Sequence, residues 1–160
     1  MSALFPTRNS LSAKCRQSVC ALLNQTLAEL TDLQAQARQA HWNVRGRQFY
    51  PLHLLFDQLN GELGAQLDPL AERITALGAS ANGTIQQVVA ASKLPAFPTD
   101  ARGELDYVTA LAERFGLVAT GVRQRVDECA TLGDTGSADL LTGISQVLDK
   151  GLWFLEAHTV

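Results

Sequence analysis

Apolar residues recur at three- and four-residue steps along most of this chain, and no stretch alternates between apolar and polar residues as a β-strand would. This spacing is typical of amphipathic helices that bury one face. Asn9 or Ser10 is expected to cap the first helix, and Thr99 or Asp100 the third. The long predicted helices cover residues 9–41, 51–77, 99–131 and 137–155. The pattern predicts an all-α four-helix bundle.

The connection over residues 78–99 is too long for a hairpin loop. It is rich in small residues and is closed by Pro95 and Pro98. A short apolar patch from Thr84 to Ala91 predicts an extra helix inside it. The connection therefore suits a single crossover from one end of the bundle to the other.

Composition bounds the domain count and the compartment. A length of 160 residues with 46% hydrophobic residues predicts one domain over 1–160, with residues 1–9 as a flexible tail. No apolar run approaches the ~20 residues that span a bilayer, and the first residues lack a signal-peptide core, so we expect a cytoplasmic protein without a membrane segment. Three cysteines without CxxC spacing, at positions 15, 20 and 129, predict free buried thiols.

Two pairs of side chains in the second helix have the spacing of metal ligands. His53 and Asp57 lie four residues apart, as do Asp68 and Glu72, so each pair shares one face, one turn apart. From Asp57 to Asp68 a straight helix returns to within about 20° of the same face. A further histidine, His41, lies near the end of the first helix. Single surface carboxylates are usually only solvated, but two pairs in phase together with His41 favour a site.

The two pairs lie too far apart to share one ion within a chain. Their separation along the helix axis is ~16 Å, whereas metal–ligand bonds are roughly 2 Å long. A second copy of the helix, packed antiparallel about a two-fold axis, would bring His53 and Asp57 of one chain to Asp68 and Glu72 of the other. Pro69 conflicts with this estimate because it predicts a kink that would redirect Asp68 and Glu72.

Imidazoles with carboxylates, and without thiolates, suit borderline metals. Iron is the favoured ion, although zinc and manganese accept the same ligands. Trp42, next to His41, is interpreted as a packing residue of the core or of an interface, and His158 as a terminal surface residue. Neither a nucleophilic triad motif nor a glycine-rich phosphate loop is found.

Several of these residues stand in motifs that resemble the Dps family, the DNA-binding proteins from starved cells, which are mini-ferritins. The resemblance covers nearly the whole chain from about residue 11. It is carried by AHWNVRG at 40–46, Phe49, Leu52-His53, Asp57, Asp68, AER at 71–73, Asp149-Lys150 and the LWFLEA that follows.

The resemblance implies a hollow, ferritin-like shell of twelve chains with a ferroxidase centre at each two-fold interface. His41, His53 and Asp57 would come from one chain, and Asp68 and Glu72 from the other, as metal ligands and catalytic residues. Family members oxidise Fe(II), typically with hydrogen peroxide in preference to dioxygen, and store the ferric mineral, which protects the cell from oxidative stress. The family also has acidic pores near the start of the last helix. Asp139 matches one of their residues, and Asp134 is a further candidate.

Two other functions stay open at this stage. Relatives that compact DNA and associate with the nucleoid use lysine-rich tails, but the N-terminal tail here offers only Arg8 and the C-terminus has no basic cluster. With 13 basic and 16 acidic residues the chain lacks the basic excess of a nucleic-acid binder, which argues against DNA binding. The other alternative is a structural helical oligomer whose site holds zinc without turnover.

Overall fold

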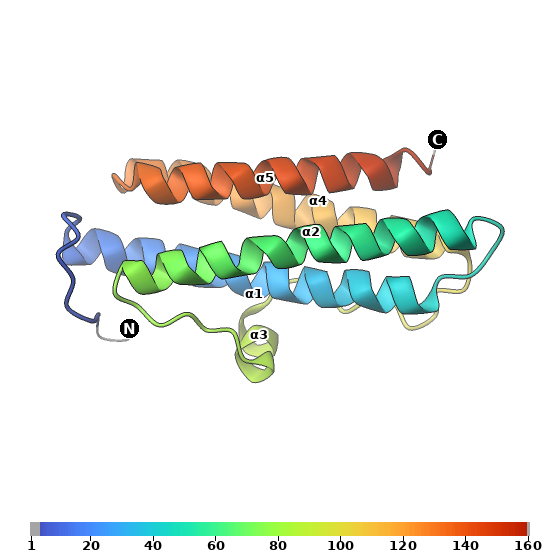
Figure 1. Cartoon of the computed structure of the whole chain (residues 1–160), viewed down its shortest axis with the longest axis horizontal. Helices are drawn as coiled ribbons and strands as arrows, with labels where there is room; N and C mark the ends of the chain where they lie inside the picture. Colours follow the sequence, from blue (N-terminus) through green and yellow to red (C-terminus); the bar gives the residue numbers. More distant parts are fainter. Residues whose placement is uncertain (1–3, 160) are drawn as a thin grey trace.

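The computed structural model describes residues 4–159 and contains helices but, within that range, no strand. Of the five helices in this range, the four long ones lie side by side and the short one lies outside them (Figure 1). The helices are α1 (Ala13–Asn43), α2 (Phe49–Ala76), α3 (Ile85–Ala91), α4 (Glu104–Thr131) and α5 (Thr135–Glu156). The predicted all-α four-helix bundle, with one long crossover carrying a short helix, is confirmed.

The core lies between two antiparallel hairpins of helices. α1 packs against α2, α4 packs against α5, and α1 contacts α4 across the middle. Each long helix buries one apolar stripe, as its periodicity predicts. The largest fully buried side chains are Leu23, Leu30, Leu33, Leu52, Phe56, Leu59, Leu63, Leu70, Ile74, Leu77, Leu111 and Phe115.

The start of α1 differs from the prediction by about three residues. The side chain of Ser12, not that of Asn9 or Ser10, caps the helix by accepting a hydrogen bond from the amide of Cys15 (3.2 Å). Asn9 instead forms a local turn, since its side-chain oxygen accepts from the amide of Leu11 (2.9 Å). Asn and Ser are common both in turns and as helix caps, so the residue types alone did not show which of them caps α1.

The start of α4 is also later than predicted, at Glu104 instead of just after Thr99 or Asp100. The carboxylate of Asp106 reaches back from inside the helix and accepts from the amides of Arg102 (2.9 Å) and Gly103 (2.8 Å). These two hydrogen bonds lower the pKa of Asp106 below its ordinary value. Helix α5 begins at Thr135, two residues before the predicted Ser137, because Asp134 is its cap.

Helix α2 ends as predicted, and the chain then crosses the bundle. Gly78 has a φ of +91°, which is the left-handed conformation that a residue after a helix commonly adopts. Thr84 caps α3 in the predicted patch. Residues 1–3 of the expected tail lie outside the described residues, and in the remainder the amide of Phe5 donates to the carbonyl oxygen of Gly78 (2.7 Å).

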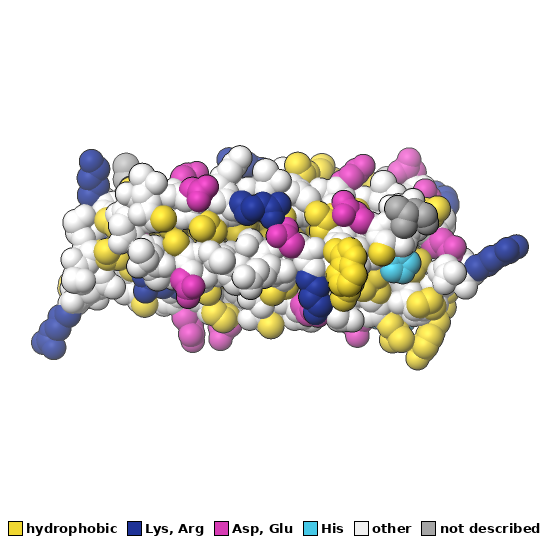
Figure 2. All heavy atoms as spheres, turned by 90° about the horizontal axis from the view of Figure 1, so that it is seen from above, with side chains coloured by type: hydrophobic (Ala, Val, Ile, Leu, Met, Phe, Trp, Pro, Cys, Tyr) yellow, Lys and Arg dark blue, Asp and Glu magenta, His cyan; other side chains and the backbone are white. Residues whose placement is uncertain are grey.

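The surface of the described residues carries charges of both signs. Figure 2 shows Lys and Arg side chains interspersed with Asp and Glu on one face, without a continuous basic area there. Within residues 4–159, none of the helices combines the length and the apolar character that crossing a membrane requires.

Candidate metal centre

His41 and His53 meet at the end of the bundle where α1 passes into α2. His41 stands in the last turn of α1, and His53 in the second turn of α2. Their rings stack with centroids 3.8 Å apart and planes 20° apart. The ring of Phe49 lies against His53 at 5.1 Å. The tertiary fold thus brings together two histidines that are twelve positions apart in sequence.

Each histidine is oriented by the backbone of the other. Nδ1 of His41 lies 2.8 Å from the carbonyl oxygen of His53, and Nδ1 of His53 lies 2.8 Å from the carbonyl oxygen of His41. A carbonyl oxygen can only accept, so both Nδ1 atoms carry the proton. In the neutral rings both Nε2 atoms therefore hold a free lone pair, which is the form that ligates a metal.

The hydrogen bond to His41 also completes the end of α1. Helix α1 ends at Asn43, so the carbonyl of His41 is one of the last four that lack a helical partner. The imidazole of His53 supplies the missing donor. The orientation of the rings is therefore tied to the helix end and to the turn over residues 44–48.

A carboxylate outside the hairpin holds that turn. Glu104, in the first turn of α4, accepts a hydrogen bond from the amide of Gln48 (2.8 Å). Gln48 precedes α2 and makes no side-chain cap of its own. Gly46 has a φ of +140°, and a Cβ there would collide with the Glu104 carboxylate, so this contact requires glycine. Sequence reasoning missed Glu104, because no local pattern connects residue 104 with residue 48.

The carboxylates of the candidate site are exposed along α2. Asp57 lies one turn beyond His53, and Asp68 and Glu72 lie one turn apart towards the other end of the helix. Helix α2 continues unbroken from Phe49 to Ala76 through Pro69, so the two pairs stay ~16 Å apart along the axis. Among the described residues, no group of three His, Cys, Asp or Glu side chains is placed to hold a metal ion within one chain.

The interior of the bundle offers no free carboxylate in the described residues. The buried acidic side chains are Glu29 and Asp134, and each has an arginine partner. Arg125 pairs with Glu29 at 2.8 Å, and Arg73 with Asp134 at 2.7 Å. Both carboxylates are thereby neutralised by a cation that would compete with a metal ion.

Asp134 and Asp139, the predicted pore residues, have different surroundings. Asp139 is exposed in the second turn of α5. Asp134 is only 3% exposed; it caps α5 and binds Arg73. Sequence reasoning missed both roles of Asp134, and its partner Arg73 comes from another helix. The pore itself stays a prediction.

Trp42 is not a core residue in the described chain. Its side chain is 68% exposed next to His41, and Tyr50 and Leu54 on α2 are also exposed. Of the two packing roles predicted for Trp42, packing in the core is therefore wrong for the single chain, and packing in an interface stays a prediction. His158 is exposed, as predicted, and its Nδ1 donates to the carbonyl oxygen of Phe154 (2.7 Å).

The thiols are buried and free, which confirms the prediction for Cys15, Cys20 and Cys129. Burial raises the pKa of Cys20, and burial together with the nearby Asp134 and Glu128 raises the pKa of Cys129 to about 11. Both groups are therefore protonated near neutral pH. A thiol in this state is a poor metal ligand, so the cysteines are separate from the candidate site.

Comparison with known proteins identifies the family. Residues 20–160 match a family described as "Ferritin-like domain". The chain is 42% identical over 152 residues to the "DNA protection during starvation protein" of Agrobacterium fabrum, covering 95% of this chain and 94% of the relative. The chain belongs to the Dps family of ferritin-like proteins. A second Dps relative, "DNA protection during starvation protein 2" of Deinococcus radiodurans, is 36% identical over 89% of this chain and 58% of its own length.

Solved Dps structures share the whole fold. DpsC from Streptomyces coelicolor superposes with a TM-score of 0.94 at 29% identity, over 99% of this chain and 92% of the other. DpsA14 from the same organism gives a TM-score of 0.92 at 30% identity, over 98% of this chain and 94% of the other. The likeness spans both hairpins and the crossover, so the Dps fold accounts for every helix described here.

Proposed function

We propose that this Dps-family chain is a ferroxidase and iron store, whose catalytic sites form between two copies of the chain. The observation that carries the proposal is the pair of histidines that fix each other through their Nδ1 atoms. This arrangement leaves a free lone pair on Nε2 of each ring, and the exposed Asp57 follows His53 by one turn of α2. Imidazoles oriented in advance in this way are typical of ligands that bind a metal.

The remaining ligands would come from a neighbouring chain. Asp68 and Glu72 are exposed on the same helix, but too far along it to reach the ion held by His53 of their own chain. A two-fold axis that runs the two α2 helices antiparallel completes two equivalent sites at once. The exposed Trp42, Tyr50 and Leu54 give this end of the chain the apolar surface that an interface between copies would bury.

Iron is the substrate that suits this ligand set and this family. Two imidazoles with three carboxylates match non-haem Fe(II), while zinc would bind the same groups without redox chemistry. In the proposed reaction, two Fe(II) ions each give one electron to hydrogen peroxide. Its O–O bond breaks, two protons are taken up, and two Fe(III) ions and two water molecules form.

The protein residues hold the reacting ions and stabilise their charge. Each carboxylate offsets part of the charge that rises when Fe(II) becomes Fe(III), whereas the neutral imidazoles keep the site from becoming too anionic to release product. The ferric product would then pass into a hollow shell of twelve chains in the cytoplasm. Dioxygen is the alternative oxidant, and it would need more electrons per molecule to reach water.

Protection of DNA follows from this chemistry without contact with DNA. The relatives named above carry DNA protection in their names. Fe(II) and peroxide together generate hydroxyl radicals, so consuming both protects nucleic acid at a distance. The mildly acidic chain, with a net charge of −3, supports this route over direct compaction of DNA.

The test is Fe(II) oxidation by peroxide in assembled protein. In the double variant His53→Ala and Asp57→Ala, we expect the fast phase of oxidation to fall at least about 10-fold while the oligomer persists. Glu62→Ala is the matched control, because Glu62 lies on the same helix but is directed to Lys150 of α5 (2.9 Å). Wild-type rates in an assembled double variant would refute the proposed site. Zinc in the purified protein together with no oxidation would favour the structural zinc oligomer.

A further inference from the structure

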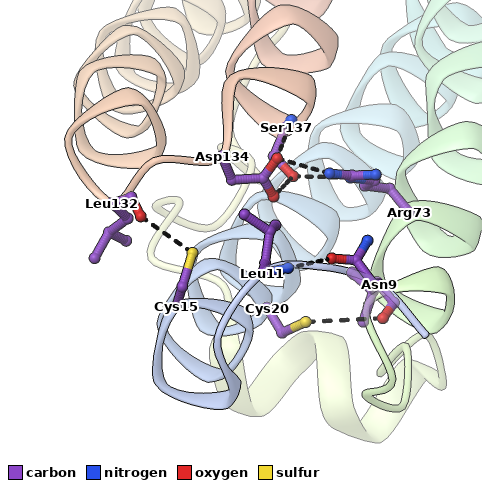
Figure 3. Close-up of polar contacts among 9 residues, drawn as sticks. Asn9, Leu11, Cys15, Cys20, Arg73, Leu132, Asp134 and Ser137 are labelled. Atoms are coloured by element: carbon purple, nitrogen blue, oxygen red, sulfur yellow. Dashed lines mark hydrogen bonds and ion pairs between the residues drawn. The ribbon is translucent and has the colours of Figure 1, made fainter. Parts of the chain in front are cut away.

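A closed polar network joins the last turns of α2 to the start of α5 (Figure 3). Arg73 donates from Nη2 to Oδ1 of Asp134 (2.7 Å) and from Nε to Oγ of Ser137 (3.0 Å). The hydroxyl of Ser137 donates to Oδ2 of Asp134 (2.6 Å), and the amide of Ser137 donates to Oδ1 (3.0 Å). Both carboxylate oxygens are thus occupied, and Asp134 is almost fully buried.

This network holds the side chain of Arg73, which is next to Glu72 in α2. Consecutive residues of a helix are rotated by about 100°, so Arg73 can face α5 while Glu72 faces solvent. Glu72 is exposed, whereas the guanidinium group of Arg73 donates to Asp134, the cap of α5, and to Ser137 in the first turn of α5. Any rotation of this turn about the helix axis would break one of those bonds and would also redirect Glu72.

Pro69 weakens the backbone hydrogen bonding of α2 just before this turn. It has no amide hydrogen, so the carbonyl of Ala65 receives no helical hydrogen bond, and Gly64 further loosens the same turn. Beyond Pro69 the helix is held by buried Leu70 and Ile74, whose apolar contacts tolerate small rotations. Arg73 adds hydrogen bonds, which hold only when the donor and acceptor are aligned.

We propose that Arg73 is a positioning residue, which acts through Asp134 and Ser137 to aim Glu72 at the metal site of the neighbouring chain. The inference rests on the proposed function, since that function gives Glu72 a metal to bind. It assigns Asp134 a role at the junction of α2 and α5, with no free carboxylate oxygen left for passing ions.

The experiment measures Co(II) binding to the assembled, tag-free protein, by affinity and by the visible absorption spectrum of the bound ion. Arg73→Ala is expected to weaken Co(II) binding about 10-fold and to change the spectrum, because the geometry of the ligands changes. Arg73→Lys should restore part of the affinity, since an ammonium group reaches Asp134 but cannot reproduce the two-donor fork. The matched control is Arg123→Ala, which removes a different arginine–aspartate pair, Arg123–Asp149 between α4 and α5 at 2.7 Å.

Each outcome supports or overturns the inference. Co(II) affinity and spectrum of assembled Arg73→Ala equal to those of the wild type would overturn it, as would equal losses in Arg123→Ala. If Arg73→Ala does not assemble, Ser137→Ala is the deciding variant. It keeps the Arg73–Asp134 ion pair but removes the hydrogen bond from Arg73 to Ser137, and unchanged Co(II) binding in this variant overturns the inference. Wild-type protein that binds no Co(II), or binds it equally in the His53→Ala and Asp57→Ala double variant, contradicts the proposed function itself.

Discussion

His53 donates its Nδ1 proton to the carbonyl oxygen of His41, 2.8 Å away, and His41 returns the same bond to His53. The two hydrogen bonds therefore leave Nε2 of both rings free to bind a metal, and the one that His53 donates also completes the end of α1. Each bond joins a ring of one histidine to the backbone carbonyl of the other, so removing one side chain removes only the bond that it donates and leaves the other bond in place. Variants of one histidine thus test a single ligand while the orientation of the other is largely kept.

A site shared between chains predicts complementation. We expect co-expression of the His53→Ala and Asp57→Ala variant with the Asp68→Ala and Glu72→Ala variant to restore activity that neither has alone. Random pairing makes half of the dimers mixed, and each mixed dimer has one intact site of two, so about a quarter of the wild-type rate should return. The measurement is the initial rate of ferric absorbance after Fe(II) and peroxide are mixed. No gain over either parent, in assemblies shown to contain both chains, would place the ligands within one chain.

The contact of Glu104 with Gln48 predicts a link between α4 and the turn beside the histidines. Glu104→Ala should lower the free energy of unfolding by about 1–2 kcal/mol, because an amide loses a charged acceptor. Hydrogen exchange at the amide of Gln48 should also become faster. Asp127→Ala, an exposed carboxylate on the same helix, is the control. Unchanged exchange at residue 48 would show that Glu104 does not hold the turn.

Pro69 predicts a stabilising substitution. Pro69→Ala restores the donor to the carbonyl of Ala65 and removes the ring from the helix interior, so stability should rise by about 1–3 kcal/mol. Pro51→Ala serves as the comparison, because a proline in the first turn of α2 costs little and its loss should change stability by less than about 0.5 kcal/mol. Chemical denaturation of both variants gives the two values. Destabilisation by Pro69→Ala would mean that the packing around Leu70 and Arg73 depends on a bend at this residue.

Cys129 predicts a dependence of stability on alkaline pH. Its pKa is raised from 9.0 to about 11 in the folded state, mainly by burial, so the folded state retains the proton more tightly than the unfolded state. This contribution to stability is fully present below about pH 9 and is lost as the pH rises towards 11. Stability should therefore fall less steeply over this range in Cys129→Ala than in the wild type.

The same burial predicts that Cys129 resists alkylation. At pH 8 the folded protein should leave Cys129 unmodified by iodoacetamide, and denaturant should expose it, as peptide mass spectrometry would show. Rapid modification of the folded protein would mean that the end of α4 opens readily.

Much of the fold was predictable because helix formation and amphipathic spacing are local properties. The stripes of leucine predicted four helices, and Thr84 marked the short helix of the crossover. The cap residues were harder: Asn9 and Asp100 are good caps by composition, but Ser12 and the Asp106 carboxylate made the actual bonds.

The sequence by itself determined the pairs within one helix, His53 with Asp57 and Asp68 with Glu72, because residues four apart always share a helix face. Only the tertiary structure decided that His41 stacks on His53 and that Asp134 is bound by Arg73. These contacts join separate helices, and their geometry depends on how the helices pack, how the turn at 44–48 runs and where each helix ends. Spacing along the chain indicates roughly where a helix ends, but it does not specify how the helices pack or which side chains meet across them.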